Sequence, residues 1–213
     1  VTHVLAVSAV GIMKKHIVPG DIVVPDQLFD RTKDIRPHTF FGDGIAGHVS
    51  MADPFCDELR QAAAAAARDC GATVHEGGTY VCMEGPQFST LAESELYRSW
   101  GCDVIGMTNM PEAKLAREAE MCYATVAMVT DYDCWHPDHD HVTVDAIIKV
   151  LLANADNGRA LVKEVAPALS GRTGACEAGC HTALDDAIIT GPDARDPEMT
   201  KKLSAAAGRA PQT

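Results

Sequence analysis

The chain has 213 residues, of which 46% are hydrophobic and 23% are charged, a composition typical of a globular domain that can build its own core. Its formal net charge of -12 argues against nucleic acid or an anionic membrane as a partner, because both favour basic surfaces. No apolar run approaches the roughly 20 residues needed to span a bilayer. Eight cysteines scattered through apolar segments favour free thiols in a reducing compartment, so we expect a cytoplasmic protein.

Strands and helices are predicted to alternate along the chain. Strands are expected over 4–7, 22–24, 73–83, 104–107 and 124–129, and helices over 56–70, 89–99, 111–121 and 144–163. Residues 30–47 are polar and contain several Gly and Pro, which predicts a long loop. This alternation indicates the α/β class, with a mixed central sheet flanked by helices. We expect a single domain over residues 1–213, in which 168–213 form an irregular C-terminal extension with a short terminal helix.

Small and polar residues follow three of the predicted strands. They occupy residues 8–11, 107–108 and 130–133, and the loop 84–89 is a fourth candidate. In α/β proteins the ligand crevice lies outside the carboxyl ends of strands. We therefore expect these segments to share a ligand site.

Asp131 and Asp133 are the most informative pair. Their period-two spacing in an extended segment would point both carboxylates the same way. In a partly dry pocket one carboxyl would have a raised pKa and could donate to a purine N7, while the ionised one could accept from an exocyclic amine. The alternative is that Asp131 only caps the turn that follows, and spacing alone favours this structural role.

Three longer segments of the sequence carry recognisable motifs. Residues 78–93 read GTYVCMEGPQFSTLAE, residues 104–112 read VIGMTNMPE, and residues 130–135 read TDYDCW. Together they resemble the signature of the purine nucleoside phosphorylases, and the third string resembles the 5'-methylthioadenosine phosphorylase family. The inosine/guanosine-type enzymes differ, because they have a Glu where this chain has Ser89 after Phe88. The resemblance runs from about residue 4 to about residue 165.

The resemblance implies phosphorolysis of 5'-methylthioadenosine to adenine and 5-methylthioribose 1-phosphate, with inorganic phosphate as co-substrate and no metal or organic cofactor. It implies Asp131 at N7 and Asp133 at the 6-amino group as catalytic residues, and a homotrimer with sites completed across its interface. The implied phosphate ligands are Ser8, Ala9 and Thr108. The implied substrate contacts are Met107 at the ribose, Phe88, Ser89, Val10, Gly11 and Ile105 at the base, Val144 and Ile148 at the methylthio group, and His48 in the neighbouring subunit's site.

The family's glycine-rich phosphate loop and its Arg-His-Gly segment have no counterpart in this sequence, and both precede the region where Val1 begins. We therefore expect an N-terminally truncated member of the family, in which the first strands are missing and activity is weak or absent when the chain is expressed alone. Alternatives are phosphorolysis of methylthioinosine or another purine nucleoside, hydrolysis by water, and a subunit that only binds purine.

Cysteine and histidine clusters suggest metal sites only weakly. Cys176 and Cys180 could form a disulfide or half of a zinc site, but no second pair at short spacing completes four ligands. We therefore expect two thiols in a packed tail. His136, His139 and His141 lie in an acidic, polar loop, which favours a solvated lid hinge over a metal site.

Overall fold

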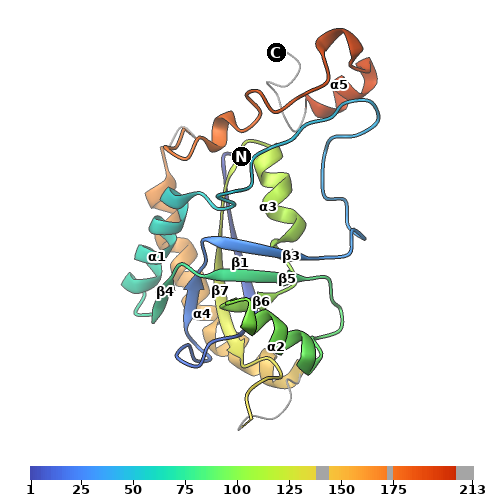
Figure 1. The fold of residues 1–213 in the computed structure, drawn as a ribbon. Helices are drawn as coiled ribbons and strands as arrows, with labels where there is room; N and C mark the ends of the chain where they lie inside the picture. The colour runs from blue at the N-terminus through green and yellow to red at the C-terminus, as the bar shows by residue number, and fades with distance from the viewer. Residues whose placement is uncertain (138–143, 172–174, 205–213) are drawn as a thin grey trace.

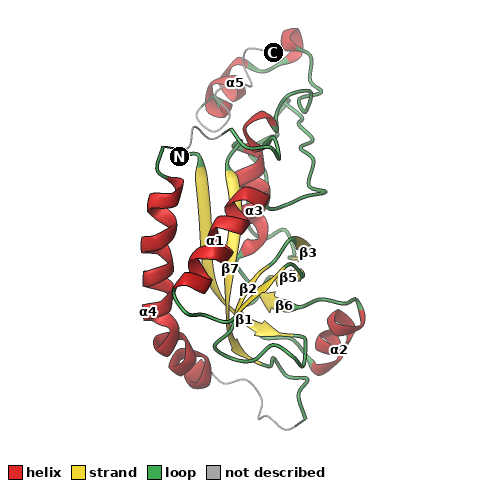
Figure 2. Cartoon of the chain, turned by 90° about the vertical axis from the view of Figure 1, so that its left-hand side faces the viewer, coloured by secondary structure: helices red, strands yellow, loops and turns green. Residues whose placement is uncertain are grey.

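The computed structural model describes residues 1–137, 144–171 and 175–204; His139 and His141 of the expected lid hinge lie outside these ranges. The described part contains a seven-stranded mixed sheet with helices on both faces (Figures 1 and 2). Its strands are β1 His3–Ile12, β2 Ile22–Val24, β3 Gln27–Arg31, β4 Val74–Glu76, β5 Thr79–Met83, β6 Val104–Gly106 and β7 Cys122–Asp131. Its helices are α1 Asp57–Asp69, α2 Leu91–Ser99, α3 Asn109–Glu118, α4 Val144–Leu169 and α5 Pro197–Leu203, with short 3₁₀ turns at Cys180–Thr182 and Pro192–Ala194.

The strand order is β3-β5-β6-β1-β7-β2-β4. The central pair, β1 and β7, is parallel and in register from His3 opposite Cys122 to Val10 opposite Val129. β6 joins β1 in the antiparallel sense and β2 joins β7 in the antiparallel sense. The outer pairs are parallel. The predicted mixed α/β sheet is confirmed.

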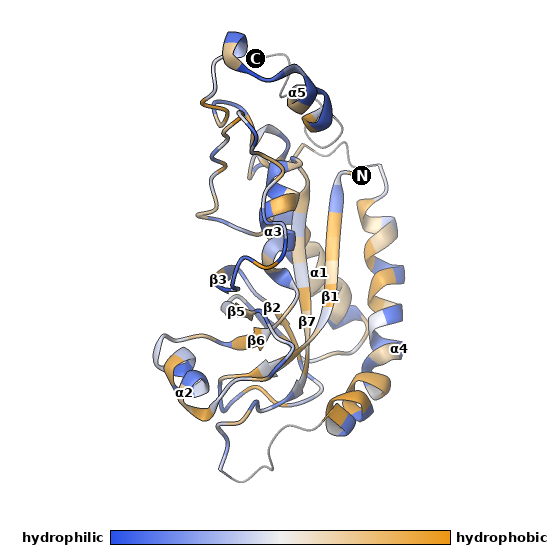
Figure 3. Ribbon diagram, turned by 90° about the vertical axis from the view of Figure 1, so that its right-hand side faces the viewer, coloured by the Kyte–Doolittle hydropathy of each residue, from blue (hydrophilic) through white to orange (hydrophobic). Residues whose placement is uncertain are grey.

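β7 forms the centre of the core because its residues from Cys122 to Thr130 are all buried. Alternate side chains enter opposite layers, as the pleat of a strand requires. Val126 and Met128 pack with the apolar faces of α1 and α4, whereas Ala127 and Val129 pack in the layer that contains α3. Figure 3 shows β1 and β7 as largely hydrophobic strands between these layers.

Local sequence signals account for the helix ends. α1 stops before Gly71, whose φ of +82° suits the left-handed conformation that follows many helices. α2 begins with a capping box, in which the Thr90 hydroxyl accepts from the Glu93 backbone N–H and the Glu93 carboxylate accepts from the Thr90 backbone N–H. Thr90 is therefore the cap, and α2 begins at Leu91, two residues later than predicted.

Several predicted elements and boundaries were wrong. The single strand predicted over 73–83 is two strands, β4 and β5, and β3 was not predicted as a strand. β1 continues through residues 8–11, which were expected to follow the strand, because pairing with both β7 and β6 extends it. Residues 30 and 31 were expected in a loop but end β3, an edge strand that alternates exposed and half-buried side chains and pairs with β5 over all five residues. α4 continues through Pro167 to Leu169, because Leu161, Val165 and Leu169 pack against the sheet side of the core.

The C-terminal extension packs against the long loop that follows β3. Leu184, Ala187, Met199 and Leu203 form a small core with Phe41 and Ile45. Backbone bonds from His48 N–H to the Ala187 carbonyl and from Ile189 N–H to the Ala46 carbonyl join the two segments. In Figure 1 this unit lies beyond the N-terminal ends of β1 and β7. Within the described ranges, no helix is both long and apolar enough to cross a membrane.

Candidate active site

A cavity of about 420 Å³ lies where the middle of β1 meets the ends of β6 and β7. The first two turns of α4 and the loop after β5 complete its wall. It is lined by Val7, Ser8, Ala9, Val10, Gly11, Met83, Phe88, Ile105, Gly106, Met107, Thr108, Thr130, Asp131, Asp133, Val144 and Ile147. The three strand-associated segments expected to share a site therefore do so.

A β-bulge shapes this part of the sheet. Val10 pairs with Val129 but Gly11 pairs with Asp131, so Thr130 is an extra residue on β7. Bulges redirect side chains and are common beside active sites. Gly11 is required for close approach, because a Cβ on it would lie 2.9 Å from Asp131 Oδ1 and 3.1 Å from Ile105 Cγ2.

Asp131 accepts hydrogen bonds on both carboxylate oxygens. Its Oδ1 accepts from the Asp133 backbone N–H at 2.9 Å, and its Oδ2 accepts from the Thr130 hydroxyl at 2.6 Å. The turn-capping role considered from the sequence is therefore present, and the same carboxylate also lines the cavity. The two roles are compatible because a carboxylate has about four lone-pair positions.

Asp133 reaches the cavity by a different route from the one expected. The segment is not extended at this point, since Asp133 has a φ of +52°, in the left-handed region. Its side chain is buried, and this burial raises the pKa of the Asp133 carboxyl, with the nearby Asp131 charge acting in the same direction. The cavity thus contains one carboxyl that keeps its proton to a higher pH than an ordinary aspartic acid, because its pKa is raised.

Besides Thr130, two other hydroxyl side chains line the cavity, those of Ser8 and Thr108. The Ser8 Oγ is buried and has no hydrogen-bond partner among the described residues. Thr108 occupies the cap position of α3, but its side chain makes no capping hydrogen bond. Both hydroxyls can therefore donate to a ligand that enters the cavity.

The remaining wall is apolar. Val144 and Ile147 of α4 line the cavity with Met83, Phe88 and Ile105. Ile148 was expected there but does not line the cavity and is 45% exposed. Ile147 takes this position because residues three apart on a helix share a face as well as residues four apart, so the sequence pattern permitted either.

Arg36 is a site residue that the sequence analysis missed. Its guanidinium donates to the Met107 carbonyl at 2.9 Å, to the Glu84 carbonyl at 3.1 Å and to the Glu84 carboxylate at 2.8 Å. It thereby joins the loop after β5 to the segment after β6, both of which contribute to the cavity wall. Arg36 lies in the long polar loop, and no motif in that loop indicates this role.

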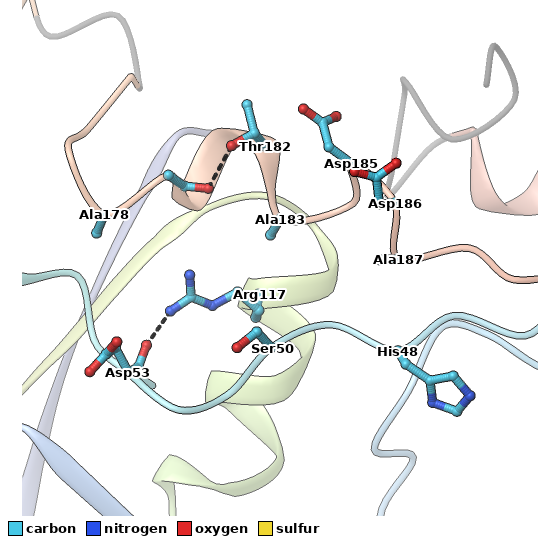
Figure 4. A pocket seen from close by; sticks show the side chains of 11 residues that line it. His48, Ser50, Asp53, Arg117, Ala178, Thr182, Ala183, Asp185, Asp186 and Ala187 are labelled. Atoms are coloured by element: carbon cyan, nitrogen blue, oxygen red, sulfur yellow. Dashed lines mark hydrogen bonds between the residues drawn. The ribbon is translucent and has the colours of Figure 1, made fainter.

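Besides Ile148, two other predicted residues lie outside the cavity. The Ser89 hydroxyl donates to Met83 Sδ at 3.6 Å, behind the lining residue Met83. His48 is exposed and belongs to a second cavity, beside the C-terminal extension (Figure 4). The structure therefore does not bring His48 together with the aspartates of the same chain.

Comparisons with known proteins place the chain in a family. The phosphorylase superfamily model matches residues 1–167. The chain is 58% identical to the S-methyl-5'-thioadenosine phosphorylase of Rhodospirillum rubrum, covering 98% of this chain and 71% of that protein. It is likewise 58% identical to the enzyme of that name from Cereibacter sphaeroides, covering 98% of this chain and 72% of that protein.

Solved structures agree. A methylthioadenosine phosphorylase from an antarctic soil metagenomic library has a TM-score of 0.89 and 46% identity, covering 97% of this chain and 72% of that one. A methylthioadenosine phosphorylase from Schistosoma mansoni in complex with adenine has a TM-score of 0.77 and 35% identity, covering 80% and 67%. The fold is thus that of the phosphorylase superfamily. Within that superfamily, the chain belongs to the methylthioadenosine phosphorylase family.

Proposed function

We propose that this chain carries out phosphorolysis of 5'-methylthioadenosine, releasing adenine and 5-methylthioribose 1-phosphate. The observation that carries the proposal is one cavity that combines an aspartate pair, the hydroxyls of Ser8 and Thr108, and an apolar wall. Relatives with 58% identity are named for this activity, and a structural neighbour binds adenine.

The reaction forms a bond from a phosphate oxygen to the ribose C1' and breaks the bond from C1' to the purine N9. The bonding electron pair leaves with the purine, so a proton at N7 allows adenine to depart neutral. A positioned acid contributes roughly 10²–10⁴-fold to such a step. Asp131 and Asp133 are proposed to supply the proton and to accept from the 6-amino group.

Which of the two aspartates donates the proton to N7 can be tested. Family resemblance implies Asp131 at N7, whereas the raised pKa of Asp133, caused first by burial, favours Asp133 as the carboxyl that holds the proton. The second assignment also suits Asp131, whose two oxygens already act as acceptors. If Asp133 holds the proton, Asp133→Asn will remove the basic limb of the pH–rate profile and Asp131→Asn will leave that limb in place.

Phosphate is proposed to bind at Ser8, Ala9 and Thr108, and Met107 is proposed to contact the ribose. The apolar residues Val144 and Ile147 would then accept the methylthio group, in the position proposed from sequence for Val144 and Ile148. No metal or organic cofactor takes part in this scheme.

We further propose that the protein is a cytoplasmic homotrimer that acts in purine and methionine salvage. Eight free cysteines support a reducing compartment. Apolar side chains on the first half of α4 support an interface, since Val144 is 59% exposed and Leu152 is 68% exposed. Sedimentation analysis tests the proposed trimer. A structure of that assembly would test whether His48 lies at the active site of a neighbouring subunit.

The deciding assay measures adenine release from methylthioadenosine with and without inorganic phosphate. Phosphate-dependent release that falls by about 10²-fold or more in Asp131→Asn, with enough residual turnover to record its pH profile, and that is retained in the exposed control Asp193→Asn, supports the proposal. Release without phosphate would show a hydrolase instead. Faster turnover of methylthioinosine or adenosine than of methylthioadenosine would show that one of these nucleosides is the preferred substrate. If the chain showed no turnover, and calorimetry showed that it binds adenine equally well with and without phosphate, it would be a subunit that only binds purine.

A further inference from the structure

Four cysteines from distant parts of the sequence meet at the start of β7. The proposed active site lies at the other end of this strand. The Sγ atoms of Cys56, Cys122, Cys176 and Cys180 all lie within 4.8 Å of one another, and all four are free thiols. Cys56 immediately precedes α1 and Cys122 begins β7. The other two lie in the C-terminal extension, so the cluster joins that extension to the start of the central strand.

The spacing of these thiols fits a single tetrahedral metal ion. Zinc–sulfur bonds of about 2.3 Å place neighbouring sulfurs of a tetrahedral site about 3.8 Å apart. Cys176 and Cys180 also show the short C-x₂₋₄-C spacing that is typical of structural zinc sites. The missing second pair, which led us to expect only packed thiols, is supplied by Cys56 and Cys122, which are 66 residues apart in the numbering and could not be recognised as a pair from spacing.

The surroundings of the cluster also suit bound thiolates. The Cys180 backbone N–H donates to Cys176 Sγ at 3.3 Å, and the Arg117 guanidinium donates to Cys180 Sγ at 3.7 Å. Arg117 is buried and its other arm donates to the Asp53 carbonyl; Figure 4 shows it beneath the turn that carries Ala178 and Thr182. Four thiolates around Zn²⁺ carry a net charge of −2, which a buried guanidinium partly balances.

We propose that Cys56, Cys122, Cys176 and Cys180 bind one zinc ion, which fastens the C-terminal extension to the sheet. Binding replaces the thiol protons with four zinc–sulfur bonds and releases those protons to solvent. Four protein ligands leave no open position for water or substrate, so the site is structural and takes no part in phosphorolysis.

The test is the metal content of the chain purified under reducing conditions and then equilibrated with zinc. Native mass spectrometry is expected to show one zinc per chain, lost in Cys56→Ser and Cys180→Ser and retained in Cys70→Ser, a half-buried cysteine outside the cluster. Substitution with Co²⁺ should give the strong visible absorption of tetrahedral cobalt bound to thiolates. The wild type provides a further readout if a variant fails to fold, because a mercurial reagent should release one zinc as it modifies the four thiols.

Several outcomes would overturn the proposal. A reduced chain that binds no zinc would do so, as would disulfides among these cysteines in the protein purified without oxidant. Bound iron in place of zinc would reject the metal assignment, and full zinc occupancy in both cluster variants would reject the ligands.

Discussion

Replacing Gly11 with alanine should damage the proposed active site more than the fold. The new Cβ would lie 2.9 Å from Asp131 Oδ1, 3.1 Å from Ile105 Cγ2 and 3.4 Å from Asp133 Cβ. The first two distances are too short for ordinary contact, so the Asp131 carboxylate must move away from its donors. Overpacking typically costs about 1–3 kcal/mol, and alanine in a strand recovers roughly 0.5–1 kcal/mol relative to glycine. The net loss of unfolding free energy should therefore be about 0–2.5 kcal/mol.

Activity should fall further, because a displacement of the order of 1 Å in a catalytic group can cost about 10²-fold in rate. The assay is phosphate-dependent adenine release, compared with unfolding by urea on the same samples. Gly158→Ala is the matched control, since its Cβ would meet only Met128 Sδ at 3.5 Å and Met128 Cε at 3.7 Å, which are ordinary contacts. Wild-type kcat/KM in Gly11→Ala, with the fold intact, would refute the view that Asp131 must stay in this position.

Three further changes test other features. Arg36→Ala removes the donor to the Met107 carbonyl and should lower kcat/KM about 10-fold, since hydrogen bonds from charged groups contribute roughly 1.5–3 kcal/mol. The same change at the exposed Arg159 should have no effect, and equal kcat/KM values in the two variants would contradict a role for Arg36 in holding the cavity wall. Asp133→Asn should gain unfolding free energy relative to the wild type as pH rises above about 4, the ordinary pKa of an aspartic acid. The raised pKa of the native Asp133 carboxyl contributes stability that is fully present below the unfolded pKa and is lost as pH rises through the folded pKa. A difference independent of pH in urea unfolding would count against this reasoning. Thr90→Ala should lose about 1 kcal/mol of unfolding free energy through the α2 cap, whereas Thr90→Ser should not, and an unchanged melting temperature in the alanine variant would show that the cap contributes nothing.

The parts of the fold that the sequence predicted best have strong local signals. β7 was recognisable because its nine residues from Cys122 to Thr130 are buried on both faces and therefore read as an apolar run. Met107 and Asp131 were found because they lie at the ends of buried strands, Met107 directly after β6 and Asp131 as the last residue of β7. The edge strand β3 was missed because its exposed polar and charged residues resemble a loop, and only pairing with β5 reveals the strand.

The features that could not be predicted depend on contacts between distant residues. Arg36 is 71 positions from the carbonyl it holds at Met107, and no local pattern marks such a contact. The burial that raises the pKa of Asp133 follows from a left-handed turn after β7, not from the two-residue spacing. Cys56 and Cys122 likewise become neighbours only when α1 packs beside β7.

Asp131 is the last residue of β7 and Asp133 follows two residues later. The position of both carboxyls therefore depends on how the buried side chains of β7 pack in the core. Exchanging Val126 or Val129 for a side chain of another volume would slide the strand end by fractions of an ångström, since dense interiors transmit strain. Turnover would register such a shift in addition to the loss of stability that a volume change in a dense core causes. Residues far from any ligand would thus tune the enzyme, and a mutational survey of β7 would map rate onto the packing of the interior.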